Sequence, residues 1–233
     1  MTQLEENRWR LEGATPSEVL VKLPEMGKLM VIFRENGATH ERIGIVDSVS
    51  ENDGSLALKG EAHDAEIDIS ALSGVVLDTS SEMRVKTYPR LEFVGQDDAA
   101  VFSIVGMDGL DPFTDPLAPL TRSATGPRNS SSTPEDDEQP DLETDEGHVF
   151  LQTLVGAGVE IAVTRPGFRQ AWHGRIEDVK PAMGFSNVMT KDFHLHLKGG
   201  TVSDWQADGD ISFALDAAGN RIGLSVRRLG EQA

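Results

Sequence analysis

Two stretches of this chain, residues 28–120 and 158–230, read as one β-rich unit written twice. Each copy opens with an apolar segment that ends near an arginine, LMVIFRE in the first copy and VEIAVTRP in the second. The matched positions are Arg34 with Arg165, Gly44 with Gly174, Gly74 with Gly200, and Phe93 with Phe213. Repetition of a β-rich unit predicts an intramolecular dimer, with a cleft between the copies as the place for a ligand.

The spacing of the copies predicts three regions. Each copy has fewer than about 100 residues and would be marginal alone, so the two are expected to pack together. Residues 121–147 hold eight acidic residues, two arginines and many Ser, Thr and Pro. Such a segment cannot bury enough apolar surface to offset its ordering entropy. We therefore divide the chain into a first repeat with an N-terminal helix (1–120), a disordered acidic linker (121–147) and a second, shorter repeat (148–233).

Helix signals precede both copies. Thr15-Pro16-Ser17-Glu18 forms a capping box with proline at the first helical position. Asp145 is placed to cap a second helix that carries apolar residues up to Leu154. The remainder alternates or runs apolar between short turns, which predicts six to eight mostly antiparallel strands per copy. The fold class is α+β with β dominant: two similar antiparallel-sheet units with short helices, related as an internal pseudo-dimer.

The charge balance argues against two classes of partner. The chain carries 39 acidic against 21 basic residues, a formal charge of −18, which repels nucleic acid and anionic lipid.

The residue content also limits the chemistry. The chain has no cysteine, so disulfides, thiolate metal sites and thiol nucleophiles are excluded. We find no apolar run of membrane-span length and no signal-peptide pattern at the N-terminus. We expect a cytoplasmic protein with a small-molecule ligand and no nucleic-acid or membrane partner, monomeric through internal pseudo-symmetry or homodimeric.

One run of motifs resembles a known family. The segment from Met30 to Gly44 has an apolar strand, an Arg-Glu-Asn-Gly turn and a His-Glu-Arg-x-Gly run, and so resembles the ChuX/HutX and HemS group of haem-utilisation proteins. Pro89–Phe93, an acidic turn and Val101–Val105 resemble a strand–turn–strand segment of that group. The resemblance covers both copies, weakly in the second, and omits residues 121–147. The second copy has Trp172-His173-Gly174-Arg175 in place of the His-Glu-Arg run.

The resemblance implies a large antiparallel sheet with short helices, doubled by tandem repeat or by homodimerisation. It also implies cytoplasmic binding of haem or a haem-like compound, in a carrier, a storage protein or a haem-degrading enzyme. Haem is therefore the cofactor or ligand that we expect.

Two histidines stand on one face of a predicted strand. In Phe193-His194-Leu195-His196-Leu197, the alternation of a strand puts His194 and His196 on one face, about 6 to 7 Å apart. They are candidate ligands for haem iron or a divalent metal, or they line the solvent side of a half-buried strand. The matching positions of the first copy are approximately Glu66 and Asp68.

Further candidate ligand-binding residues lie in both copies. His40 is a candidate axial haem ligand with Glu41 orienting its second nitrogen, or both belong to a surface ladder of charges. His173 occupies a similar place in the second copy beside Trp172, where the pair contacts a flat ligand or packs in an interface. Arg34 and Arg165 either hold a propionate group or fix turns by internal ion pairs.

The motifs favour a binding protein over an enzyme without deciding between them. No nucleophile elbow, phosphate-binding glycine loop or HExxH motif is present. The first hypothesis is a cytoplasmic haem carrier or storage protein. The alternatives are a non-haem small-molecule or interaction module that retains the fold, and a haem-degrading enzyme.

Overall fold

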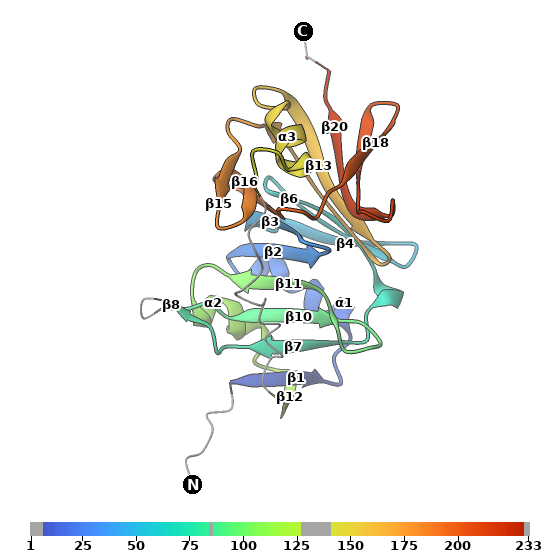
Figure 1. The fold of residues 1–233 in the computed structure, drawn as a ribbon. Coiled ribbons are helices and arrows are strands. Elements are labelled where there is room, and N and C mark those ends of the chain that lie inside the picture. The colour runs from blue at the N-terminus through green and yellow to red at the C-terminus, as the bar shows by residue number, and fades with distance from the viewer. Residues whose placement is uncertain (1–6, 84–85, 127–140, 231–233) are drawn as a thin grey trace. The chain divides into compact units, whose positions relative to one another are not determined.

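The structure is a computed structural model that describes residues 7–83, 86–126 and 141–230. It consists mainly of antiparallel strands with a few short helices, as the sequence predicts (Figure 1). The elements of the N-terminal half are β1 (Arg8–Glu12), α1 (Pro16–Leu20), η1 (Leu23–Glu25), β2 (Lys28–Glu35), β3 (Ala38–Ile45), β4 (Ser48–Asn52), β5 (Ser55–Gly60), β6 (His63–Asp68), η2 (Ile69–Ala71), β7 (Gly74–Asp78), β8 (Glu82–Met83), β9 (Lys86–Thr87), β10 (Arg90–Val94), β11 (Ala100–Gly106), α2 (Leu110–Thr114), η3 (Asp115–Leu117) and β12 (Thr121–Ala124).

The C-terminal half repeats much of this order. Its elements are α3 (Glu146–Gln152), β13 (Gly158–Arg165), β14 (Phe168–Arg175), β15 (Lys180–Ala182), β16 (Phe185–Met189), β17 (Phe193–Lys198), β18 (Asp204–Asp208), β19 (Ile211–Leu215) and β20 (Arg221–Arg228). No helix in the described part of the chain is both long and apolar enough to span a membrane.

The chain forms two compact units. The first comprises Met1–Ile32, Ile43–Ser132 and Pro166–Phe168, and the second comprises Phe33–Arg42, Thr133–Arg165 and Arg169–Ala233. The loop and adjoining strand segments of the β2–β3 hairpin thus belong to the second unit, although they come from the N-terminal half of the sequence. The tip of the β13–β14 hairpin belongs to the first unit.

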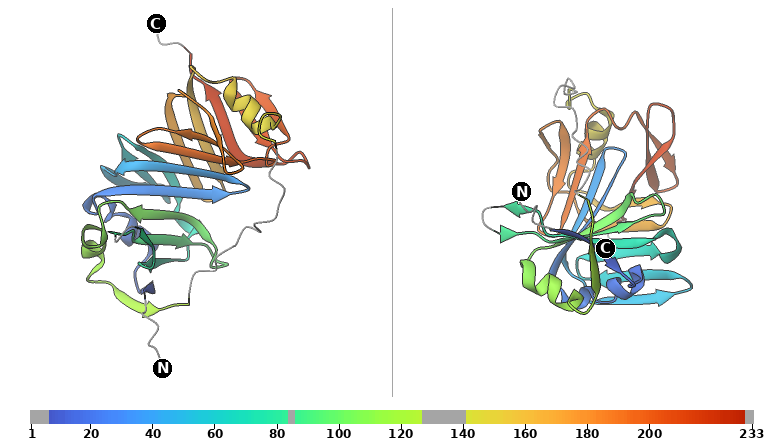
Figure 2. Two further views of the ribbon diagram at one scale, coloured as in Figure 1. Left: turned by 60° about the vertical axis from the view of Figure 1, so that its left-hand side comes forward. Right: turned by 90° about the horizontal axis from the view of Figure 1, so that it is seen from below.

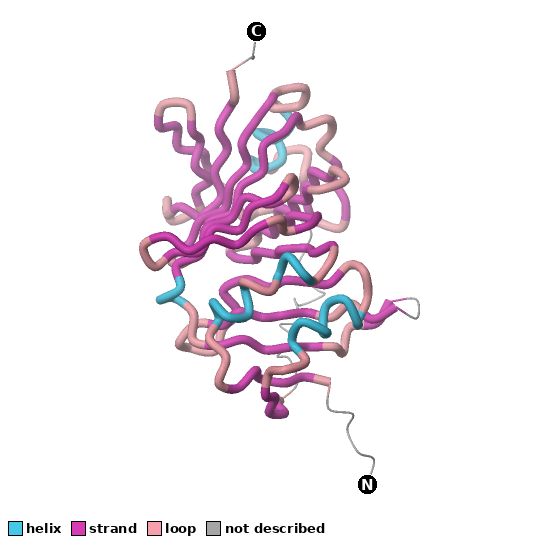
Figure 3. Tube along the Cα trace, turned by 180° about the vertical axis from the view of Figure 1, so that it is seen from behind, coloured by secondary structure: helices cyan, strands magenta, loops and turns pink. Residues whose placement is uncertain are grey.

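The first unit contains a sheet in the order β12-β1-β7-β10-β11-β2 and a smaller sheet of β4, β5 and β6. Helices α1 and α2 lie on one face of the larger sheet (Figure 3). Thr15 and Glu18 form the expected capping box at α1, and Glu18 accepts a hydrogen bond from the Thr15 amide at 2.7 Å. The fully buried side chains of this unit include Leu77, Phe93 and Phe113.

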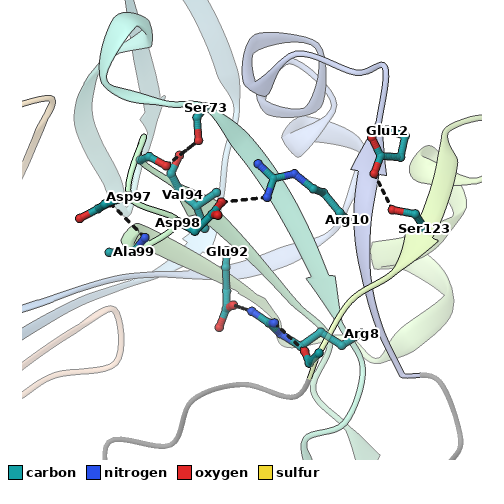
Figure 4. Close-up of polar contacts among 12 residues, drawn as sticks. Arg8, Arg10, Glu12, Ser73, Glu92, Val94, Asp97, Asp98, Ala99 and Ser123 are labelled. Carbon is teal, nitrogen blue, oxygen red and sulfur yellow. Dashed lines mark hydrogen bonds and ion pairs between the residues drawn. The ribbon is translucent and has the colours of Figure 1, made fainter.

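Charged side chains tie the strands of this larger sheet together (Figure 4). Arg8 donates to Glu92 at 2.5 Å and to the carbonyl oxygen of Gly126 at 2.9 Å. Glu92 is only 6 % exposed, so this pair is largely shielded from water. Arg10, two residues further along β1, pairs at 2.9 Å with the exposed Asp98.

The second unit contains the sheet segment β3-β17-β16-β15 and the sheet segment β18-β19-β20-β13-β14. Helix α3 lies beside these strands (Figure 2). Phe150 of α3 stacks on Trp205 of β18 with ring centroids 3.9 Å apart. Asp145 caps the helix, as predicted, by accepting from the His148 amide at 2.9 Å, and it also accepts from the Gly200 amide at 2.7 Å.

The two halves follow one plan. Each half has a helix, a two-stranded hairpin and three strands, followed by a last set of strands. The final strand of that set pairs with the first strand of the hairpin, in the order β7-β10-β11-β2 in one half and β18-β19-β20-β13 in the other. The first half has two additional strands, β8 and β9, which pair with each other. The register shifts after Phe93 in β10 and after Phe213 in β19. This repeated two-unit architecture agrees with the fold class expected from the sequence.

Counting residues along equivalent strands keeps one of the predicted matches and changes another. Gly44 and Gly174 are both the seventh residue of their strand, as proposed. Arg34 is the seventh residue of β2, whereas Arg165 is the eighth of β13, so Thr164 is the counterpart of Arg34. The match between the two arginines is therefore out by one residue.

The predicted linker lies partly outside the described residues, because 127–140 are not described. The two ends of the 121–147 segment have regular structure. Thr121–Ala124 forms β12 and pairs with β1, and α3 begins at Glu146.

Candidate functional site

Three candidate ligands meet on one face of the second unit. In the β3–β17 ladder, Glu41 is directly opposite His194, and Thr39 is opposite His196. Because side chains alternate along strands, Glu41, His194 and His196 share a face. The Glu41 carboxylate lies 3.1 Å from Nδ1 of His194 and 3.9 Å from Nε2 of His196. The structure thus brings together three residues that the sequence analysis treated as two separate sites.

This cluster is partly shielded from water. The side chains of Glu41, His194 and His196 are 13 %, 22 % and 29 % exposed. Burial lowers the pKa of His196, and the positive charge of nearby Arg34 and the neighbouring His194 act in the same direction, whereas Glu41 opposes them. Burial thus favours the neutral imidazole of His196, the form that has a lone pair for a ligand.

His40 is fully buried rather than exposed at a turn. Its Nε2 lies 3.2 Å from the carbonyl oxygen of Ile161, and Gln170 Nε2 lies 2.9 Å from its Nδ1. Burial lowers the pKa of His40 to about 3, and the hydrogen bond to Ile161 only partly opposes this effect. Both ring nitrogens are engaged, so an axial role for His40 would require its hydrogen bonds to break.

Trp172 is likewise a core residue. It is 3 % exposed and stacks on Phe193 with ring centroids 4.4 Å apart, and Phe193 also contacts the ring of His40. This packing corresponds to the alternative in which the Trp172-His173 segment contributes to internal packing.

His173 is exposed and separate from this core. Its Nε2 is 2.8 Å from Glu160, which also pairs with Arg169 at 3.3 Å. His173 is the sixth residue of β14, whereas His40 is the third of β3, so Gln170 and not His173 is the counterpart of His40.

The two candidate arginines contact residues of the β2–β3 and β13–β14 hairpins. Arg34 Nε donates to the Thr39 hydroxyl at 3.3 Å, and Arg165 pairs with Glu35 at 3.1 Å. These are the internal contacts that the sequence analysis offered as the alternative to a propionate site.

A pocket at α3 holds a histidine that is not among the candidate ligands named from the sequence. It has a volume of about 550 Å³ and is lined by Glu143, His148, Val149, Gln152 and Thr153. His148 Nδ1 is 2.8 Å from the Ser186 hydroxyl, and its Nε2 is 3.4 Å from the Gln152 amide. The guanidinium of Arg228 reaches the carbonyl oxygen of Thr153 at 3.4 Å. The sequence signal was available, since His148 and Gln152 are one helical turn apart.

Comparison with solved structures identifies the architecture. ChuS, a haem oxygenase of E. coli, matches with a TM-score of 0.72 and 16 % identity, covering 97 % of this chain and 84 % of ChuS. Holo-PhuS, a haem-binding protein of Pseudomonas aeruginosa, matches with a TM-score of 0.71 and 16 % identity, covering 97 % of this chain and 82 % of PhuS. The chain has the ChuS and PhuS fold.

This ChuS-like fold confirms the architecture that the sequence resemblance implies. The similarity is visible in three dimensions more than in sequence. No family model matches the chain, and no curated protein sequence is similar to it.

Proposed function

We propose that this protein binds haem and serves as a cytoplasmic haem carrier or storage protein. The observation that supports this most strongly is the shared fold with holo-PhuS, a haem-binding protein, over 97 % of the chain. The sequence resemblance at Met30–Gly44 points to the same ligand independently of the fold comparison.

The open pocket at α3 offers a histidine for such a ligand. Its volume of about 550 Å³ falls within the range of small-molecule sites, about 300 to 1,000 Å³. Imidazole is a common axial ligand of haem iron. Ser186 engages Nδ1 of His148, which leaves Nε2 on the side of Gln152. Haem bound there would supply the iron, and His148 would hold it.

A cation is available for a haem propionate. Arg228 is exposed, and its guanidinium lies 3.4 Å from the carbonyl oxygen of Thr153, a residue of the pocket. Arginine binds carboxylates through paired, charge-assisted hydrogen bonds. Val149 offers an apolar surface on the same pocket.

This proposal replaces His40, the axial ligand suggested from the sequence, with His148. His40 and His148 are both hydrogen-bonded at each ring nitrogen, but His40 is 0 % exposed, whereas His148 lines the pocket at α3. His173 is paired with Glu160. Arg34 and Arg165 are engaged with Thr39 and Glu35. His148 is therefore the axial ligand that we propose first.

Hemin titration of the purified full-length chain tests the function. We expect a Soret band distinct from that of free hemin, at a defined stoichiometry. His148→Ala should lose or shift this band, whereas His173→Ala, which removes an exposed histidine of the same unit, should keep it. A spectrum equal to free hemin plus inert protein would reject haem binding. An unchanged band in folded His148→Ala would reject this ligand assignment.

Haem degradation is the second candidate, because ChuS, a haem oxygenase, has the same fold. The haem complex would be incubated with a reductant in the presence of catalase, which removes peroxide and so suppresses uncatalysed ring opening. A carrier leaves the haem spectrum intact under these conditions. A biliverdin-like product above the blank would assign the protein to the enzyme class instead.

A further inference from the structure

We propose that Glu41, His194 and His196 form a binding site for a divalent first-row transition metal, with Zn²⁺ as a representative ion. The site is separate in its residues from the histidine pocket at α3, and the proposal does not depend on haem binding. It assigns His194 and His196 to a metal ion and adds the carboxylate of Glu41, which lies 153 positions before His194 in the sequence.

The spacing of the three side chains suits one ion. Their ligand atoms lie within 4.8 Å of one another. Zn–N and Zn–O bonds are about 2.0 to 2.2 Å long, so two ligands on one tetrahedral ion are about 3.3 to 3.5 Å apart. The separation of 3.1 Å between Glu41 and His194 is close to this value, and the separation of 3.9 Å between Glu41 and His196 requires only a small side-chain adjustment.

A neighbouring amide fixes the tautomer that a ligand histidine needs. His196 Nδ1 lies 2.6 Å from the Asn187 side-chain oxygen, so the ring donates there and keeps its lone pair on Nε2, the atom nearer Glu41. Asn187 is itself held, because its Nδ2 donates to the carbonyl oxygens of Lys180 and Phe185, both at 2.9 Å. Metal-binding histidines characteristically have such a second hydrogen bond on the other nitrogen.

The donor set indicates the class of metal. Two imidazoles and one carboxylate favour zinc and its first-row neighbours, and no thiolate is present to select copper(I). Three protein ligands leave at least one coordination position open. The partial exposure of all three side chains gives water or a small anion access to that position.

The site occurs in one copy of the repeat. The counterparts of His194 and His196 are Asp64 and Glu66, at the second and fourth positions of β6, which corrects the approximate match to Glu66 and Asp68 made from the sequence. The counterpart of Glu41 is Ala171. Since the equivalent strands form without imidazoles at these positions, the fold does not require the two histidines.

Zn²⁺ binding to the metal-stripped full-length chain, measured by competition with a chelating indicator, tests the proposal. We expect one high-affinity ion per chain and a rise in Tm on addition of Zn²⁺, since binding to the native state alone stabilises it. Glu41→Gln, His194→Ala and His196→Ala should each weaken binding at least tenfold. Asn187→Ala should weaken it about 10- to 100-fold, as is typical when the partner of a ligand histidine is lost.

His173→Gln is the matched control. It removes another His–Glu pair of the same unit, His173 with Glu160. Neither residue belongs to the cluster of Glu41, His194 and His196. Zn²⁺ affinity should be unchanged in this variant. Co²⁺ should give visible bands of a four- or five-coordinate ion in the wild type and lose them in His196→Ala.

Two results would overturn the site. One is the absence of saturable Zn²⁺ binding to the wild type, and the other is wild-type Zn²⁺ affinity in folded His194→Ala and His196→Ala. If Glu41 and His194 form an ion pair and no metal site, Zn²⁺ will not change the Tm of the protein, and this result would also contradict the proposal. Folding of each variant is checked by circular dichroism, and His196→Gln replaces any alanine variant that does not fold. Hemin titration of the same variants separates this result from that of the haem proposal, because their Soret response should persist.

Discussion

Gln170 donates a hydrogen bond from its side-chain amide to Nδ1 of His40 at 2.9 Å, and the two residues hold the same position in the two copies of the repeat. Each is the third residue of its strand, β14 for Gln170 and β3 for His40. Both are fully buried. The carbonyl oxygen of Ile161 accepts from Nε2 on the other side of the ring, so the two partners together require a neutral imidazole.

This arrangement predicts acid sensitivity. The pKa of His40 is about 3 in the folded state against about 6.5 for an unperturbed histidine. Below pH 6.5 the unfolded chain therefore takes up a proton at this position that the folded chain refuses. The free energy of unfolding should fall as the pH decreases from 6.5 toward 3, by at most about 1.4 kcal/mol per pH unit from this residue. Above pH 6.5 the residue contributes no pH dependence.

His40→Gln tests this by removing the titrating group. Urea unfolding at pH 8, 6 and 5, with a chelator present, gives the pH dependence of stability for both proteins. The variant should be less stable at every pH because buried partners are lost, but its stability should fall by about 1 kcal/mol less than that of the wild type between pH 6 and pH 5. Parallel curves for the two proteins would contradict the prediction.

Gly174 leaves room for a buried tryptophan. A Cβ at this position would lie 2.1 Å from Cζ2 of Trp172, whose ring is held by Phe193. Gly174→Ala should therefore cost about 1 to 3 kcal/mol through overpacking and alter the tryptophan fluorescence. Gly158→Ala in β13 is the control, because its Cβ would meet nothing nearer than 3.9 Å. Equal unfolding free energies for the two variants would show that Trp172 moves aside without cost.

Local sequence patterns were sufficient to predict α1, α3 and the β-rich character of both copies, but they did not predict α2 (Leu110–Thr114). The capping residues Thr15 and Asp145 mark helices α1 and α3, and the alternation in Phe193–Lys198 predicts which side chains of β17 are buried. These signals depend on neighbours within a few residues, so they do not require knowledge of the tertiary fold.

Long-range pairing explains what sequence reasoning missed. β3 contains successive buried residues on both faces, including Thr39, His40 and Arg42, so alternation gives no sign that His40 is enclosed. Glu41 joins His194 only because β3 pairs with β17. That register is set by residues far apart in the chain, and no local motif encodes it.

Arg8 and Arg10 should differ in their contribution to stability, although both pair with acids in the same unit (Figure 4). Arg8 lies beside Glu92 at 2.5 Å and Asp78 at 3.7 Å, and both carboxylates are buried. Removing a cation from buried carboxylates typically costs about 3 to 5 kcal/mol. Because Arg8 is itself 17 % exposed, we expect about 2 to 4 kcal/mol for Arg8→Met.

Arg10→Met is the comparison for this prediction. Its partner Asp98 is 73 % exposed, so its loss should cost less than about 1 kcal/mol. Urea unfolding of both variants in low and moderate salt gives the two values. A larger loss for Arg10→Met than for Arg8→Met would contradict the ranking.

The cap of α3 should affect both stability and haem affinity. Asp145 accepts from the amides of His148 and Gly200, and so fixes the helix that carries the proposed axial ligand. Asp145→Ala should cost about 1 to 3 kcal/mol and should weaken hemin binding, because His148 would no longer be held at the pocket. Thr15→Ala removes the equivalent cap of α1 in the other copy. It should lower stability by about 1 kcal/mol while leaving the Soret titration unchanged. Equal hemin affinity in folded Asp145→Ala and the wild type would show that this cap does not position a haem ligand.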